Sequence, residues 1–158
     1  MQVWLPDGTR KERTGWRCEA ISERHRMWGF NCPAVDLDFV MAEFNHGLPV
    51  ALIEYKERHA TQPHLMSPTY RALTALANGY GGGPLPFFIV FYDPVEWWFR
   101  VVPVNEPAYS HYRHVLNELI TEQRFVRSLY LLRKKTLSLE DEEVIRRLST
   151  TLPEAPSA

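Results

Sequence analysis

Apolar runs separated by turn residues divide the chain into predicted strands and helices. Residues 34–57, "AVDLDFVMAEFNHGLPVALIEYKE", contain two apolar stretches on either side of "NHG", which predicts a β-hairpin. The run "PFFIVFY" at 86–92 is apolar throughout, as in a strand buried on both faces. After the turn "DPVE", residues 97–104 predict a further strand, in which at least one of the two neighbouring tryptophans is buried.

Helical patterns with start and stop signals account for much of the remaining chain. The segment "SPTYRALTALANG" has Ser67 as N-cap, Pro68 at the first helical position and Gly79 at its end. Apolar residues at helical spacing predict one helix over residues 109–135. A short helix over 138–149 opens with the spacing of a capping box.

Two more elements are expected before the hairpin, a helix over residues 15–29 and a short strand over 30–34. The order is therefore helix, short strand, two hairpin strands, helix, two strands and C-terminal helices. It predicts an α/β fold with a mixed β-sheet flanked by helices and with extra C-terminal helices. We expect one domain over residues 1–150 and a flexible tail at 151–158.

The composition is that of an ordinary globular protein, with 45% hydrophobic and 23% charged residues among 158. A net charge of −1 gives no overall attraction to nucleic acid, although basic clusters occur at 10–13, 23–26 and 132–135. No apolar run reaches the roughly 18 residues of a membrane span, and the N-terminus lacks the apolar core of a signal peptide. With only two cysteines and no CxxC pair, a cytoplasmic protein with reduced thiols is expected.

Charged residues interrupt the apolar hairpin, and they require an explanation. Asp36, Asp38, Glu54 and Lys56 stand among Val, Leu, Ile and Phe, where an unpaired charge costs several kcal/mol. Because alternate residues of a strand share a face, the two aspartates point to one face of the first strand. The glutamate and the lysine likewise share one face of the second strand.

The turn decides whether these charges meet. A three-residue loop with Gly47 in the left-handed conformation sets Phe44 opposite Leu48. Counting back along both strands then sets Asp38 opposite Glu54, and the other aspartate opposite the lysine. Directly opposed side chains lie within about 5.5 Å, so all four charges gather at one end of one face.

A cluster of carboxylates on one face suits a divalent cation. Close carboxylates repel each other unless a cation lies between them, and Mg²⁺ takes one or two carboxylates together with waters and phosphate oxygens. Lys56 on the same face could orient a bound water or stabilise charge on phosphorus. The alternative is an ordinary surface ion pair, in which the lysine neutralises the aspartates at a strand end near solvent.

The spacing of these residues resembles that of the PD-(D/E)XK nuclease superfamily, which has the restriction-endonuclease-like fold. Asp38 is followed after fifteen residues by Glu54-Tyr55-Lys56, and "VALIEYK" is similar to a strand of small Holliday-junction-resolvase-type nucleases. The resemblance covers roughly residues 16–92. It implies a metal-dependent nuclease that hydrolyses the phosphodiester bonds of DNA, with Mg²⁺ or Mn²⁺ as cofactor.

By this resemblance Asp38 and Glu54 bind the metal, the carbonyl of Tyr55 contributes a ligand, and Lys56 is the catalytic lysine. Because the proline of the motif is not contiguous with an aspartate, Asp36 is a second candidate for the first ligand.

Several families of this superfamily also carry a glutamate on the first helix. Glu23 is expected in that role, with Glu19 one turn earlier as the other choice and a solvated surface position as the alternative.

Other readings and candidates remain open. The same fold could serve as a non-catalytic binding or assembly module, with the C-terminal helices as its partner surface and a homodimer as one such assembly. Alternatively, the chain could be an unrelated α/β protein. Arg58, Arg71 and Arg100 are candidate phosphate contacts. His111 and His114 form an HxxH spacing without the further Cys or His residues that a zinc site needs.

Overall fold

In the computed structural model of this chain, the structure describes residues 37–43 and 46–150. These residues belong to one compact unit that begins at Leu37. The elements expected at 15–29 and 30–34 and the tail at 151–158 lie outside the described residues.

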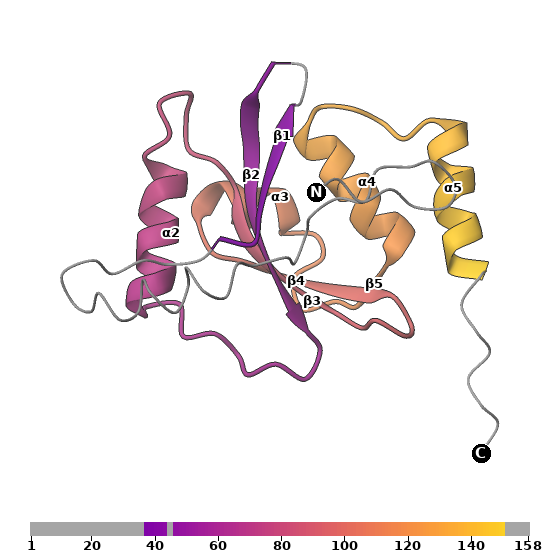
Figure 1. Cartoon of the computed structure of the whole chain (residues 1–158), viewed down its shortest axis with the longest axis horizontal. Helices are drawn as coiled ribbons and strands as arrows, with labels where there is room; N and C mark the ends of the chain where they lie inside the picture. The colour runs from indigo at the N-terminus through magenta and orange to yellow at the C-terminus, as the bar shows by residue number, and fades with distance from the viewer. Residues whose placement is uncertain (1–36, 44–45, 151–158) are drawn as a thin grey trace, which may run out of the picture. The chain divides into compact units, whose positions relative to one another are not determined.

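A five-stranded mixed sheet forms the centre of the described unit (Figure 1). Its strands are β1 (Phe39–Glu43), β2 (Leu48–Glu57), β3 (Phe87–Tyr92), β4 (Trp98–Pro103) and β5 (Ile120–Thr121), in that spatial order. Strands β2 and β3 are parallel, whereas the other neighbours are antiparallel. The helix between β2 and β3 provides the crossover that a parallel pair requires. The predicted α/β class with a mixed sheet is confirmed.

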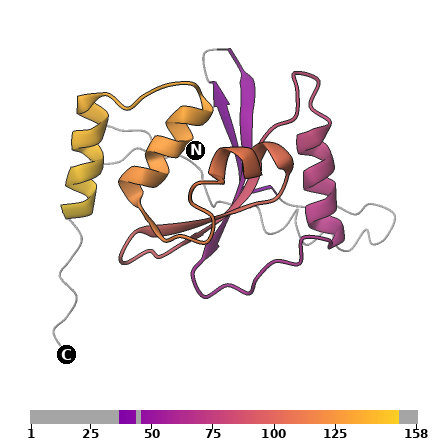
Figure 2. The ribbon, with the colours of Figure 1, turned by 180° about the vertical axis from the view of Figure 1, so that it is seen from behind.

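Helices cover both faces of this sheet. Helix α2 (Pro68–Asn78) packs on one face, where its buried residues Tyr70, Leu73 and Ala77 meet alternate residues of β2 and β3. Helices α3 (Glu106–Tyr112) and α4 (Glu122–Leu132) pack on the other face through Ala108, Tyr112 and Phe125. The two views show α2 and α4 on opposite sides of the strands, with α3 in front when the unit is seen from behind (Figures 1 and 2).

Strand β3 is buried on both faces, as its apolar run predicts. Phe87, Ile89 and Phe91 face α2, whereas Phe88 and Val90 face α3 and α4, and each is at most 1% exposed. Burial of a side chain of this size contributes about 1.5–3 kcal/mol. Strand β3 therefore joins the two halves of the core.

Helix α2 begins and ends where the sequence predicts. Ser67 has extended N-cap dihedral angles, Pro68 occupies the first turn, and Gly79 is the C-cap. The hydroxyl of Ser67 makes no capping hydrogen bond, so the fixed φ of the proline defines this start rather than a side-chain cap.

The expectation of one helix over 109–135 is wrong. The side chain of Asn105 accepts a hydrogen bond from the amide of Ala108 and starts α3 earlier than predicted. After Tyr112 the chain turns, Asn117 adopts a left-handed conformation with φ of 62°, and β5 pairs with β4 before Thr121 caps α4. Asparagine tolerates this conformation better than most residues, and apolar spacing does not report it.

The turn of the hairpin also differs from the prediction. Glu43, not Phe44, pairs with Leu48, and a register shift follows because Ala42 pairs with Pro49 while Met41 pairs with Ala51. Val50 is thus an extra residue on β2, as in a β-bulge. The bulge restores, for the rest of the hairpin, the register that the three-residue turn was expected to give.

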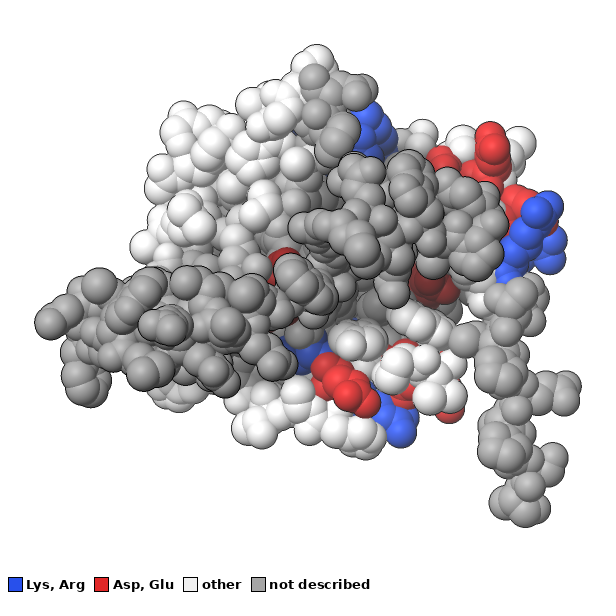
Figure 3. Space-filling model, in the orientation of Figure 1, with Lys and Arg blue, Asp and Glu red and all other residues white. Residues whose placement is uncertain are grey.

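The last helix, α5 (Leu139–Thr150), starts with the predicted capping box. The amide of Asp141 donates to Oγ of Ser138 at 3.1 Å, and the amide of Ser138 donates to Oδ2 of Asp141 at 3.0 Å. Acidic and basic side chains lie side by side around this helix (Figure 3). No helix among the described residues is both long and apolar enough to span a membrane.

Candidate functional site

The hairpin register brings two of the predicted carboxylates to one end of the sheet. Phe39 pairs with Ile53, so continuing the register by one residue sets Asp38 opposite Glu54. The amide of Tyr55 donates to Oδ2 of Asp38 at 3.0 Å, which fixes the aspartate beside β2. Oδ1 of Asp38 has no partner among the described residues. This end of the hairpin coincides with the carboxyl ends of the parallel strands β2 and β3, where α/β proteins commonly bind ligands.

Glu54 is a buried carboxylate, only 8% exposed. Its Oε1 accepts a hydrogen bond from Nζ of Lys56 at 2.9 Å. Its Oε2 is buried and has no hydrogen-bond partner among the residues that the structure describes. A buried carboxylate oxygen without a partner loses its hydration without compensation, and such a group calls for an explanation such as a bound ion.

Lys56 remains protonated in this setting. Partial burial would lower the pKa of its ammonium group, but the hydrogen bond to Glu54 and the charges of Glu54 and Asp38 outweigh burial, and the pKa is raised. Lys56 is therefore a cation and a hydrogen-bond donor at neutral pH, not a general base.

Tyr70 of α2 also belongs to the described site, and no pattern in the sequence singles it out. Burial raises the pKa of its hydroxyl, Lys56 lowers it through charge and a hydrogen bond, and Glu54 and Asp38 raise it, so the net pKa is above 10.0. The phenol is thus protonated at neutral pH and can donate. A tyrosine in an amphipathic helix normally fills a core, and only the packing of α2 on β2 places this one beside the carboxylates.

The backbone of Tyr55 faces the same end of the hairpin. The amide of Leu52 donates to the carbonyl of Pro86, just before β3, and the amide of Arg58, just after β2, donates to the carbonyl of Tyr92 of β3. The even-numbered residues of β2 therefore direct their backbone groups toward β3. The amide and the carbonyl of a strand residue point to the same side, and Tyr55 therefore directs its carbonyl toward β1 and Asp38.

The candidate phosphate contacts differ in how they are engaged. Arg58 forms an ion pair with Asp93, a fully buried carboxylate that also accepts from the amides of Val95 and Glu96. These hydrogen bonds, first that from Glu96, lower the pKa of Asp93. Arg58 therefore anchors the turn between β3 and β4. Arg71 on α2 is exposed.

The remaining chemical candidates do not form a site in the described residues. Nε2 of His111 donates to the carbonyl of Ser128 at 2.9 Å, whereas His114 is exposed. Trp97 and Trp98 are both half-buried, so the expectation that one is buried is wrong. Trp97 has a left-handed φ of 51°, which breaks the strand alternation on which that expectation depended.

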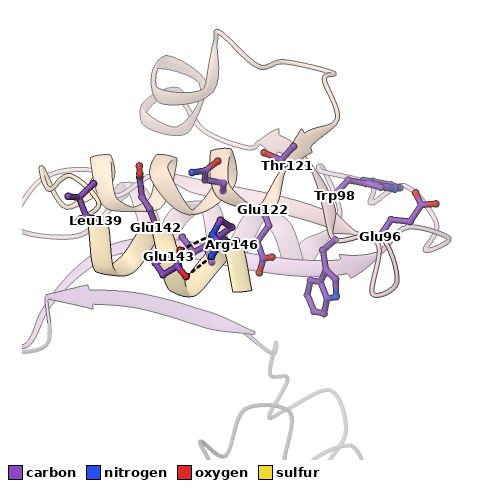
Figure 4. A pocket seen from close by; sticks show the side chains of 11 residues that line it. Glu96, Trp98, Thr121, Glu122, Leu139, Glu142, Glu143 and Arg146 are labelled. Carbon is purple, nitrogen blue, oxygen red and sulfur yellow. Dashed lines mark hydrogen bonds and ion pairs between the residues drawn. The ribbon is translucent and has the colours of Figure 1, made fainter. Parts of the chain in front are cut away.

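A cavity of about 650 Å³ lies away from the predicted residues, between α5, β5 and the turn before β4 (Figure 4). Two carboxylates of its lining are already paired, Glu142 with Arg127 and Glu143 with Arg146. None of the predicted site residues lines this cavity.

The described residues bring together Asp38, Glu54 and Lys56, with Tyr70 as an addition. Asp36, Glu19 and Glu23 lie outside the described residues, and within the described ranges no group of three His, Cys, Asp or Glu residues is arranged to hold a metal. Two carboxylates and a carbonyl still fit Mg²⁺ or Mn²⁺, because Mg²⁺ commonly keeps several waters.

Comparisons of the chain with protein families, with curated proteins and with solved structures gave no match.

Proposed function

We propose that this protein is a metal-dependent nuclease with the restriction-endonuclease-like fold of the PD-(D/E)XK superfamily, hydrolysing phosphodiester bonds of DNA. The observation that carries the proposal is the buried carboxylate of Glu54. Lys56 holds one of its oxygens, and Oε2 has no partner among the described residues, on a strand position opposite Asp38. A surface ion pair does not account for this arrangement, because such a pair leaves its carboxylate hydrated.

Each residue of the candidate site has a definite role in this proposal. Oε2 of Glu54, Oδ1 of Asp38 and the carbonyl of Tyr55 would hold Mg²⁺ or Mn²⁺, with Asp36 and Glu23 adding carboxylates. When bound, such an ion polarises a phosphoryl oxygen and lowers the pKa of a coordinated water.

Lys56 contributes as an ammonium group. Its hydrogen bond to Glu54 directs the charge toward the carboxylates, where it stabilises negative charge that develops on the phosphoryl group and orients the attacking water by donation. The protonated hydroxyl of Tyr70 provides a second donor on the same face, and this donor is uncharged.

The test is cleavage of a labelled duplex DNA and a labelled DNA junction in Mg²⁺ and in Mn²⁺. The wild-type protein should cleave at least one of them, and EDTA should abolish cleavage until metal is restored. Lys56→Ala should reduce the rate by about 100-fold or more. Because Lys56→Ala leaves Glu54 without its buried partner, Lys56→Gln, which retains a donor without the charge, is measured beside it.

Thermal melts establish whether the variants are folded, and Glu57→Gln, an exposed change on the same strand, serves as the control. Full activity of folded Lys56→Gln, or activity that survives EDTA, rules out this mechanism. A folded wild-type protein that binds no divalent metal and cleaves nothing points instead to a non-catalytic binding module.

A further inference from the structure

The face of the sheet that carries Glu54 and Lys56, called here the site face, carries a second cation at a defined position. In the register of the sheet, Lys56 on β2 pairs with Phe91 on β3, and Phe91 pairs with Arg100 on β4. Side chains of directly paired residues point to the same face, so the lysine and the arginine flank Phe91 at one level. Neighbouring strands lie about 4.8 Å apart, which places the two cationic residues roughly 10 Å apart across the sheet.

Arg100 is held in place by an aromatic ring, without a charged partner among the described residues. Its guanidinium carbon lies 4.5 Å from the centroid of the Phe91 ring, which is 1% exposed, and the arginine is half-buried. No ion pair of Arg100 occurs among the described residues. Stacking on a ring engages the flat face of a guanidinium and leaves its N–H groups at the edge available for hydrogen bonds.

The other cation near this level differs in this respect. Arg58 also lies on the site face, one level beyond Lys56, but Asp93 engages its guanidinium from a fully buried position. Arg100 is therefore the better-prepared donor for an external anion. Arginine matches phosphate geometry because two of its parallel N–H groups can bind two oxygens.

We propose that Arg100 binds the phosphate next to the one that reacts at Glu54 and Lys56, so that the substrate is a polynucleotide whose backbone crosses the sheet from β2 toward β4. This inference rests on the proposed function and goes further, because it assigns a substrate-positioning residue and requires at least two phosphates. Arg100 has no contact with the proposed reacting centre. Its effect is therefore on substrate binding and not on the chemical step.

The decisive experiment compares two phosphodiester substrates, a labelled oligonucleotide and bis(p-nitrophenyl) phosphate, which has a single phosphate. Arg100→Ala should raise KM for the oligonucleotide by roughly 10- to 100-fold, the range expected for loss of a hydrogen bond to a charged group, with little change in kcat. It should leave hydrolysis of the single-phosphate substrate unchanged. Arg100→Lys should recover part of the affinity for the oligonucleotide, and Lys56→Gln should slow the hydrolysis of both substrates.

Binding in EDTA separates this inference from the nuclease proposal. Fluorescence anisotropy with labelled single-stranded and duplex oligonucleotides should show weaker binding by Arg100→Ala and a salt dependence reduced by about one phosphate contact. Arg124→Ala removes an exposed arginine of α4 and should bind as the wild type does. The oligonucleotide, single-stranded or duplex, whose affinity falls more in Arg100→Ala is the form that contacts this arginine.

The outcomes of the two proposals are distinguishable. If the wild-type protein cleaves neither substrate but binds oligonucleotide through Arg100, the nuclease assignment fails and the phosphate contact stands. If cleavage occurs and Arg100→Ala keeps the wild-type KM for the oligonucleotide, the inference about Arg100 is overturned while the nuclease assignment stands. The inference about Arg100 is also overturned if the wild-type protein does not bind oligonucleotide.

Discussion

Nζ of Lys56 lies 2.9 Å from Oε1 of Glu54, whereas the second oxygen of the glutamate is buried without a partner in the described part of the chain. The two residues are two positions apart on β2, so the strand itself holds them on one face. The lysine donates a hydrogen bond to one oxygen, and the other oxygen is buried. A divalent cation beside Asp38 would satisfy the oxygen that remains.

If Glu54 is a metal ligand as proposed, Glu54→Gln should weaken metal binding. The amide has nearly the shape of the carboxylate but lacks its charge, and a hard cation prefers carboxylate oxygen. We expect the affinity for Mn²⁺, measured by isothermal titration calorimetry, to fall by about tenfold or more. Glu57→Gln on the same strand should keep the wild-type affinity. Equal Mn²⁺ affinity of Glu54→Gln and the wild-type protein would falsify the assignment of Glu54 as a ligand.

The pairing of Asp38 with Glu54 follows from the sequence, although the turn that was expected to produce it does not form. Strand alternation places the charges on one face, and this pattern is visible in the apolar residues. The extra residue Val50 compensates for the longer turn and restores the register. A bulge depends on backbone hydrogen bonding near Pro49, which cannot donate, and hydrophobic pattern does not reveal where such a shift occurs.

The remainder of the site depended on contacts between distant parts of the chain. Tyr70 and Arg100 lie on α2 and β4, and only the packing of the helix and the order of the strands bring them to the face of Glu54. Local pattern predicted both elements but not their neighbours. In the same way, apolar spacing over 109–135 did not reveal the left-handed Asn117 that separates α3 from β5.

Lys134→Gly should stabilise the protein. The chain after α4 forms a Schellman motif, in which the amide of Lys134 donates to the carbonyl of Leu131 and that of Lys135 to the carbonyl of Tyr130. Lys134 has a φ of 54°, a conformation that costs a residue with a side chain about 1 kcal/mol relative to glycine. Urea unfolding should show a gain of up to about 1 kcal/mol. Lys134→Val should be destabilising, and a loss of stability in Lys134→Gly would contradict this account.

Asn105→Ala should destabilise the fold strongly. The buried side chain of Asn105 accepts from the amide of Phe87 at 2.9 Å and donates to the carbonyl of Leu85 and to Asn78 at 2.8 Å each. It also caps α3 by accepting from the amide of Ala108. Loss of these bonds leaves buried backbone groups unsatisfied, at a cost of about 2–4 kcal/mol.

Chemical denaturation of Asn105→Ala and of Asn105→Asp measures this cost. The aspartate retains the acceptor for Phe87 and Ala108 but loses the two donated bonds. Asn78→Ala, which removes one partner at an exposed position, should cost less than Asn105→Ala. A cost below about 0.5 kcal/mol for Asn105→Ala would show that other contacts hold together the end of α2, the start of β3 and the start of α3.

His111 should make the stability of the protein depend on pH. Burial lowers the pKa of its imidazole below 6.5, and the hydrogen bond to the carbonyl of Ser128 only partly offsets this effect. The unfolded chain then binds a proton more readily than the folded protein does. The stabilising difference is complete above about pH 6.5 and is lost as the pH falls through the folded-state pKa.

Urea unfolding at about pH 7.5 and about pH 5 tests this dependence. Between these pH values, the free energy of unfolding should fall less in His111→Gln than in the wild-type protein. His114→Gln, a change at an exposed position, serves as the control and should follow the wild type. An equal loss in His111→Gln and the wild-type protein would assign the acid sensitivity to other groups.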